Sequence, residues 1–314
     1  MGLGPAAVKL YLELWQRGIF NDLKSVIDMG SQELHVTIDT FDSLVKSAGI
    51  EDYDNSKFAN LRYYPNRPRA EAKPFYELLG FTDYSCVDLN ELYGAVSHDL
   101  NFPFEQKNLF GKFDLVADHG NNEHVFNVVE SYKTMHRLCK KGGIIIINQN
   151  MYGGNGYFNF DISFYESMAA ANRYRIIFSS YIVHVNKKYF DVEQHRLSRE
   201  GSASLGGTDQ IHIPISNELL DIINWSKDRA ELGICYVFQK LSDDDFEYAY
   251  QGDFISQLKG NYGYQLQFAV PPPGRTYLPI RANDSNNMAD GVLASIPFSK
   301  LVRHLLKRLL RRLF

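Results

Sequence analysis

Long apolar runs alternate with helix-like segments along most of this chain. The runs are apolar throughout, rather than at every second residue; examples are FDLVAD (113–118), IIIINQN (144–150) and RIIFSSYIVHV (175–185). Strands of this kind are buried on both faces, which is typical of a parallel sheet covered by helices on each side. The pattern therefore predicts an α/β fold built on a mostly parallel sheet.

The order of the expected elements can be followed to residue 241. Strands are predicted at 25–30, 84–89, 113–118, 144–150, 175–185 and 231–241, and helices at 5–20, 40–48, 70–81, 125–141 and 162–174. Residues 96–104 contain a proline and are predicted to form a loop. The polar segment 187–230 is expected to be an insertion before the last strand, so that residues 1–250 form one domain.

Polar residues follow four of these segments: MGSQ (29–32), DLNEL (88–92), HDLN (98–101) and DHGNNEH (118–124). The carboxyl ends of parallel strands meet at one edge of a sheet, and ligands bind there, where the strand order reverses. The sequence therefore predicts one ligand site at this edge.

Individual residues of these stretches suit a nucleotide-like ligand. Gly30 lets the backbone approach a ligand, and Asp28 can bind nearby polar groups. Asp88 ends a strand and can accept both hydroxyl protons of a ribose. Asp99 beside Leu100 suits the amine and the ring of adenine. The alternative interpretations are an ordinary turn for Gly30, a surface acid for Asp88 and a helix N-cap for Asp99.

Taken together, the stretches resemble class I S-adenosylmethionine-dependent methyltransferases, and most closely a bacterial branch of the small-molecule or glycan type. The matching pieces, in order, are VIDMGSQ, YSCVDL, HDLNFPF, FDLVADHGNNEHVFN, MHRLCKKGGIIIIN and GYFNFDISFYESMAAANRYRI. The resemblance covers residues 22–185 and the returning strand near 232–241. It implies a Rossmann-like, mostly parallel sheet of seven strands with helices on both faces.

The resemblance also implies S-adenosyl-L-methionine as the cofactor. By position, it places Asp28, Gly30, Ser31 and Gln32 at the methionine end, Asp88 and Leu89 at the ribose, Asp99 and Leu100 at the adenine, and Asp118 and His119 beside the sulfonium. Two departures stand out. The usual GxGxG is reduced to Gly30-Ser31-Gln32, and the connection from Gly30 to Asp88 is longer than in the family, so residues 33–68 are expected to be an insertion.

Glu123 and His124 are the main catalytic candidates. A carboxylate can orient an imidazole and raise its basicity, so that His124 takes the proton of a hydroxyl or amine. Two alternatives stay open: His119 is the base, or positioning alone suffices. The structural interpretation is that Glu123 and His124 only begin the next helix, where an acid is favourable.

The segment GGNGYFNF (153–160) provides substrate-side candidates, which are Asn155, Tyr157 and Asn159. No catalytic metal is expected. Some methyltransferases bind a divalent ion through ExxEH, but Gly120 stands where the first acid is needed.

Charge is distributed unevenly along the chain. The net charge is −4, but the tail from Lys300 to Phe314 carries six basic residues and no acid, so the rest of the chain is near −10. An acidic body argues against nucleic acid as a partner. Residues 298–314 are predicted to form a basic amphipathic helix after an irregular linker (251–297). This helix suits an anionic membrane surface or, alternatively, an acidic protein surface.

Three cysteines without a CxxC spacing favour reduced, buried thiols, and therefore a cytoplasmic protein. In that compartment the basic tail is expected on the inner face of the membrane. The favoured function is methyl transfer to oxygen or nitrogen of a small molecule or a glycan or lipid-linked precursor. The alternative is an inert methyltransferase-like binding protein recruited by its tail. A nucleotide-dependent oxidoreductase is disfavoured, since GxGxxG is absent. The oligomeric state is left open.

Overall fold

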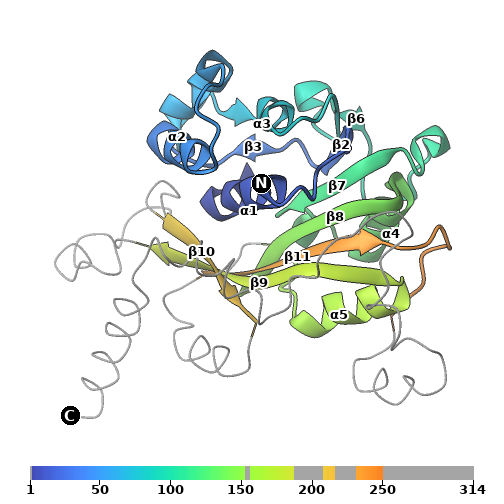
Figure 1. The fold of residues 1–314 in the computed structure, drawn as a ribbon. Helices are drawn as coiled ribbons and strands as arrows, with labels where there is room; N and C mark the ends of the chain where they lie inside the picture. The colour runs from blue at the N-terminus through green and yellow to red at the C-terminus, as the bar shows by residue number, and fades with distance from the viewer. Residues whose placement is uncertain (1, 153–155, 187–207, 216–230, 250–314) are drawn as a thin grey trace, which may run out of the picture.

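The computed structural model describes residues 2–152, 156–186, 208–215 and 231–249 (Figure 1). Its main sheet has the strand order β10-β9-β11-β8-β7-β2-β5-β6. The bounds are β2 (Ser25–Met29), β5 (Asp83–Asp88), β6 (Val96–Ser97), β7 (Phe113–His119), β8 (Cys139–Tyr152), β9 (Tyr174–Asn186), β10 (Thr208–Pro214) and β11 (Glu231–Lys240).

The predicted α/β class and the parallel core of the sheet are confirmed. Strands β6, β5, β2, β7 and β8 are parallel neighbours, and β11 returns antiparallel between β8 and β9. Two strands differ from the prediction. The short β6 lies in the segment expected to be a loop, and β10 adds an eighth strand from within the expected insertion 187–230.

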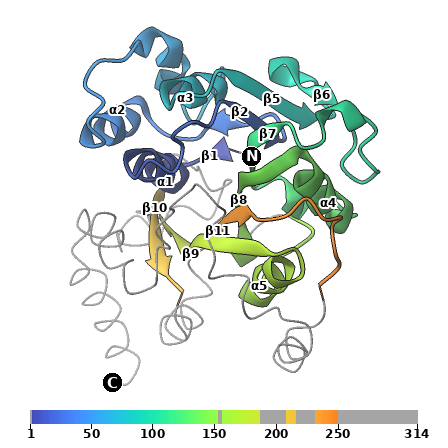
Figure 2. The ribbon, with the colours of Figure 1, turned by 45° about the vertical axis from the view of Figure 1, so that its right-hand side comes forward.

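Helices cover both faces of the sheet. Figures 1 and 2 show α1, α2 and α3 on one side and α4 and α5 on the other. Along β7, Leu115 and Ala117 pack toward the first group and Val116 toward the second, as expected when successive side chains point to opposite faces. The bounds are α1 (Pro5–Gln16), α2 (Ile38–Ser47), α3 (Lys73–Leu78), α4 (Val128–Leu138) and α5 (Ile162–Ala171).

The long connection between β2 and β5 forms part of the layer with α1. It contains α2, the 3₁₀ helix η1 (Asn55–Tyr63) and α3, and its Phe41 and Phe58 are fully buried in the core beneath them. A second, three-stranded sheet joins β3 (Glu33–Leu34) to β1 (Gly2–Leu3) and β4 (Ala70–Glu71). The chain just after Gly30 is therefore held between the N-terminal strand and this connection.

Helix α1 is also held by β10, the strand that the sequence analysis missed. The Nε2 atom of His212 lies 2.9 Å from the carbonyl oxygen of Ala6, and its Nδ1 lies 2.7 Å from Ser180 Oγ. A carbonyl can only accept, so Nε2 carries the proton and Ser180 donates to Nδ1. Burial lowers the pKa of His212 to about 4, which keeps this bridge neutral.

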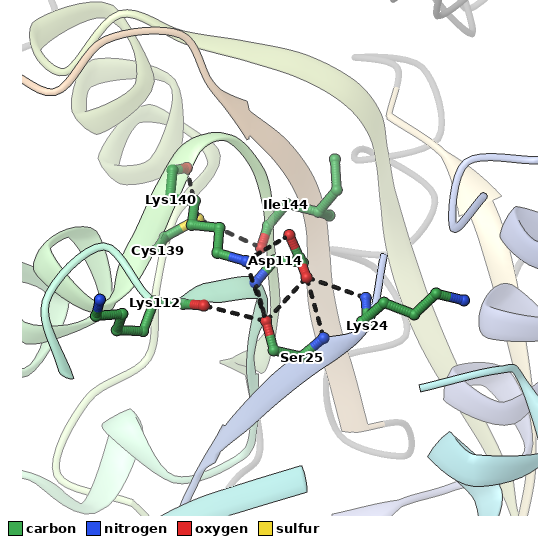
Figure 3. A network of polar contacts seen from close by, with 7 residues as sticks. All are labelled: Lys24, Ser25, Lys112, Asp114, Cys139, Lys140 and Ile144. Carbon is green, nitrogen blue, oxygen red and sulfur yellow. Dashed lines mark hydrogen bonds and ion pairs between the residues drawn. The ribbon is translucent and has the colours of Figure 1, made fainter. Parts of the chain in front are cut away.

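Asp114 joins three strands at the amino-terminal edge of the sheet (Figure 3). Its Oδ2 accepts the backbone amides of Lys24 and Ser25, each at 3.0 Å, and the Ser25 hydroxyl at 2.8 Å. Its Oδ1 lies 3.0 Å from Lys140 Nζ on β8. Burial alone raises the pKa of Asp114, but these donors outweigh it, so the pKa lies below its ordinary value.

Asp114→Ala should lower the free energy of unfolding by roughly 2–3 kcal/mol, because it removes several hydrogen bonds to a charged acceptor. The folded pKa of Asp114 is depressed, so its contribution is complete above the unfolded pKa and is lost as pH falls through the folded value. Urea unfolding of wild type and variant, at neutral and acid pH, should show the gap closing in acid. Asp83→Ala, an exposed acid at the start of β5, is the control, and an equal loss there would contradict the assignment.

Cys86, Cys139 and Cys235 are free and buried, as predicted. None of the helices in the described ranges combines the length and the apolar composition needed to span a bilayer. The predicted linker 251–297 and amphipathic helix 298–314 lie outside the described residues.

Candidate functional site

The candidate site lies where the strand order reverses, at the carboxyl ends of β2 and β7. Gly30 follows β2 with φ +90° and donates its N–H to Val87 O at 2.7 Å. A Cβ atom at this position would lie 3.0 Å from Asn121 Oδ1, in the loop after β7. The turn therefore requires glycine, both for its backbone conformation and for the close approach of the two loops.

Two parts of the predicted cofactor site are joined directly. The backbone N–H of Ser31 donates to Asp88 Oδ2 at 2.8 Å, and the Ser31 hydroxyl donates to Asn90 Oδ1 at 2.8 Å. Asp88 also accepts from the backbone and side chain of Asn90. The carboxylate is thus fixed against the glycine turn, as a ribose-binding acid needs to be. Leu89, predicted beside it, is 63% exposed.

The strand β6 brings Asp99 close to Asp88, because Asp88 is paired with Ser97. Asp99 Oδ1 accepts the backbone and side-chain N–H groups of Asn101, at 2.9 and 2.8 Å. No described residue donates a hydrogen bond to its Oδ2, while neighbouring Leu100 is buried in the core. Asp99 thus has one oxygen without a donor among the described residues and lies next to an apolar side chain, and the adenine contact stays a prediction.

Buried polar atoms without partners gather at this edge of the sheet. Each belongs to a side chain at least nine-tenths buried, and none makes a hydrogen bond of ordinary geometry to a described residue, although the Gln149 amide lies near the Asp118 carboxyl. An unsatisfied buried donor or acceptor costs about 1–3 kcal/mol, so such a concentration indicates a site for a polar ligand. The atoms are Gln32 Oε1, Asp118 Oδ2, His119 Nδ1, Asn121 Nδ2 and Gln149 Nε2.

Asp118 is the carboxyl group of this cluster. It is fully buried, and its Oδ1 accepts the Asn121 N–H at 3.0 Å. Burial raises the pKa of Asp118 to about 8, against the opposing effects of the Asn121 N–H and the nearby Gln149 amide. A buried carboxyl of this kind becomes ionised when a positive group binds beside it.

Asp28, predicted at the methionine end of the cofactor, has both carboxyl oxygens engaged by tyrosine hydroxyls. Its side chain points into the layer of α1 and α3, where Oδ1 accepts from the Tyr76 hydroxyl at 2.7 Å and Oδ2 from the Tyr84 hydroxyl at 3.1 Å. It is fully buried, and burial raises its pKa to about 7. The cause is the alternation along β2, since Asp28 faces the side opposite to Met29.

His119 is buried at the end of β7 and points toward α1. Its Nε2 lies 2.9 Å from the Tyr11 hydroxyl, whereas its Nδ1 has no partner in the described part of the chain. Burial lowers the pKa of His119 to about 3, so the ring is neutral near pH 7.

Glu123 is bound by β8 rather than by His124. Its carboxylate accepts the backbone N–H of Asn150 at 2.7 Å and also the Asn150 side-chain amide. His124 Nε2 is farther away, at 3.5 Å from Oε1. The backbone oxygen of Glu123 accepts the Tyr157 N–H at 2.7 Å. Glu123 therefore holds the loop after β7 against β8 and, through Tyr157, against the segment that precedes α5.

The residues after Glu123 lie in a 3₁₀ turn, η4 (Asn122–His124), and α4 begins only at Val128. His124 is exposed, and partial burial lowers its pKa, so it is neutral at pH 7. Phe126 and Tyr157 nearby are 76% and 70% exposed, with ring centroids 5.9 Å apart. Of the predicted substrate residues, Tyr157 belongs to this pair, Asn159 is exposed, and Asn155 lies outside the described residues.

Sequence reasoning missed several residues of the site. Gln149 and Asn150 could have been found, because they end the apolar run IIIINQN in the same way as the other polar strand ends. Asn121 lies in the stretch DHGNNEH (118–124), but no role was predicted for it from the sequence. Tyr11 has no local signal, since it is 108 positions from His119 and meets it only in the fold.

No protein-family model matches the chain, and no curated protein sequence matches it. Solved structures do resemble it. A SAM-dependent methyltransferase from Archaeoglobus fulgidus is 14% identical, with 74% of this chain and 94% of that one covered and a TM-score of 0.34. Phosphoethanolamine N-methyltransferase 2 from Haemonchus contortus, in complex with S-adenosyl-L-methionine, is 13% identical (74% and 52% covered, TM-score 0.32). The cyclase SpnF is 14% identical (74% and 80%, 0.32). At these scores the likeness assigns neither an activity nor a cofactor to this chain.

Proposed function

We propose that the chain is an S-adenosylmethionine-dependent methyltransferase that acts on oxygen or nitrogen of a small molecule or glycan precursor. The observation that carries this proposal is the cluster of unpartnered, buried polar atoms beside Gly30, at the point where the strand order reverses. The resemblance of the sequence motifs to class I methyltransferases agrees with it.

The side chains of the cluster offer the types of hydrogen-bond donor and acceptor that the methionine end of this cofactor requires. Gln32 Oε1 and Asp118 Oδ2 are acceptors that suit an ammonium group, and Asn121 Nδ2 and Gln149 Nε2 are donors that suit a carboxylate. Asp118 would become ionised beside a cation, because burial, with a smaller contribution from the Glu123 charge, raises its pKa to about 8 and a positive neighbour opposes that effect.

Two acids suit the rest of the cofactor: Asp88 at the end of β5 and Asp99 just after β6. Asp88 can accept from ribose hydroxyls, and Asp99 Oδ2 from an adenine amine. S-adenosylmethionine, when bound, supplies a methyl group carried on a positively charged sulfonium. The residues of the chain then have to hold an acceptor in line and exclude water, and positioning of this kind supplies much of the acceleration.

Asp88→Ala should weaken binding of S-adenosylhomocysteine by roughly tenfold or more, the value of hydrogen bonds to a charged group. Isothermal titration calorimetry with S-adenosylmethionine and S-adenosylhomocysteine measures this directly. Asp83→Ala, at the other end of the same strand, should bind as wild type does. If wild-type protein binds neither ligand, the methyltransferase proposal fails and the inert binding protein is left.

A further inference from the structure

A line of buried hydrogen bonds connects Asp28 on β2 to His119 on β7. Tyr76 donates to Asp28 Oδ1 at 2.7 Å, the Tyr76 and Tyr11 hydroxyls are 3.3 Å apart, and the Tyr11 hydroxyl is 2.9 Å from His119 Nε2. Asp28, Tyr76 and Tyr11 are fully buried, and His119 is 2% exposed. The four side chains come from β2, α3, α1 and β7, so only the folded protein assembles them.

The protons in this line can be ordered from its acidic end. A carboxylate only accepts, so the Tyr76 proton is committed to Asp28. The Tyr76 oxygen must then accept from Tyr11, which commits the Tyr11 proton. The Tyr11 oxygen is left to accept from His119, so Nε2 carries the imidazole proton.

The opposite order leaves a bond unmade. If Tyr11 donated to His119, its hydroxyl and that of Tyr76 would face each other with no proton between them. That order makes two hydrogen bonds in the line instead of three, and it leaves both hydroxyl oxygens as buried acceptors without a donor, which is costly. Burial lowers the pKa of His119 to about 3, so the ring is neutral and carries one proton only.

We propose that Asp28, Tyr76 and Tyr11 are positioning residues that hold His119 as the Nε2–H tautomer, and so present its buried Nδ1 as a bare hydrogen-bond acceptor to the methyl acceptor. Nδ1 has no hydrogen-bond partner among the described residues, and His119 is the last residue of β7, at the edge of the sheet where the candidate site lies. This inference rests on the proposed methyltransferase function, and it narrows the substrate class to acceptors that carry an O–H or N–H.

The role of Nδ1 follows from what methyl transfer requires. A hydroxyl or amine that donates its hydrogen to Nδ1 has its lone pair turned in a fixed direction. Orientation of this kind contributes to rate without a strongly basic group. It is compatible with the low pKa of His119, whereas complete proton removal by this ring before attack is not. A hydroxyl becomes strongly acidic as it gains the methyl group and then gives its proton to Nδ1, and a methylated amine leaves with its proton as an ammonium.

Nitrogen-15 NMR of the imidazole rings in the cofactor-free protein tests the tautomer directly, since protonated and bare ring nitrogens have well-separated shifts. The His119→Asn variant identifies the His119 signals. Spectra are recorded above the pKa of about 7 that burial gives Asp28, where the carboxylate is formed. The expected result is a roughly tenfold or greater excess of the Nε2–H tautomer, the equilibrium value of about one hydrogen bond.

Tyr76→Phe is the decisive variant. It breaks the line between Asp28 and Tyr11, frees the Tyr11 proton to turn toward Nε2, and should reduce or reverse the excess. Tyr84→Phe is the matched control, because Tyr84 donates to Oδ2 of Asp28 rather than to Oδ1 and stands outside the line. It should leave the tautomer as in wild type.

An Nδ1–H tautomer in the wild type overturns the proposal, even if Tyr76→Phe fails to fold. So does an unchanged tautomer in Tyr76→Phe, or an equal change in Tyr84→Phe. The measurement needs neither cofactor nor turnover, so it stands if the calorimetry shows no binding. In that case the line of hydrogen bonds from Asp28 to His119 is present, but the methyltransferase proposal has failed.

Discussion

Gly30→Ala is expected to weaken binding of S-adenosylhomocysteine by more than tenfold, as measured by calorimetry. Gly30 has φ +90°, where a Cβ costs about 1–2 kcal/mol. That Cβ would also lie 3.0 Å from Asn121 Oδ1, so the Asn121 side chain would have to shift by a few tenths of an ångström. This shift would move the Asn121 amide away from the atoms it is proposed to act with.

Gly80→Ala is the control that distinguishes the cost of backbone strain from a change in the geometry of the site. Gly80 has φ +96°, almost the same as Gly30, but no described atom lies within 4 Å of the position its Cβ would take. Both variants should lose similar stability in urea, and only Gly30→Ala should lose affinity. Equal loss of affinity in the two would mean that Gly30 acts through stability alone.

Glu123→Ala is expected to lower the free energy of unfolding by roughly 3 kcal/mol, because two hydrogen bonds from Asn150 to a buried carboxylate disappear. For a chain of this size that corresponds to about 6–12 °C in Tm. Calorimetric unfolding measures it. The loss should exceed that of a surface acid because the Asn150 N–H groups lose their acceptor in a buried place.

The control is Glu77→Ala, whose exposed ion pair with Lys57 should contribute no more than about 1 kcal/mol. His124→Ala should also leave Tm nearly unchanged, because its side chain is exposed. If Glu123→Ala keeps the wild-type Tm and instead loses turnover to the same extent as His124→Ala, Glu123 orients His124 and the fastening role is wrong.

The fold was largely predictable because a strand that is buried on both faces is apolar at nearly every residue. β7 and the apolar part of β8 were found from such runs, and their helices from the periodicity that follows. β6 was missed because a two-residue strand has no pattern, and the proline at position 103 indicated a loop. β10 was missed because its segment is polar as a whole.

The positions of the candidate residues were easier to predict than their contacts. Strand ends led to Gly30, Asp88 and Asp118 as candidates, because polarity at such points is a local property of the sequence. The direction of the Asp28 side chain depends on the alternation along a strand only five residues long, which motif position does not record. The partners of Glu123 and His119 are fixed by tertiary structure, which no local pattern records.

Asp118 and His119 are consecutive, so they face opposite sides of the sheet. A slip of β7 by a single residue along its neighbours would exchange them, sending the carboxyl toward α1 and the imidazole toward α4. Asp114, on the same strand, opposes such a slip by holding the first residues of β2 and the start of β8. Hydrogen bonds at one end of the strand thus decide which face of the sheet each titratable group takes at the other end.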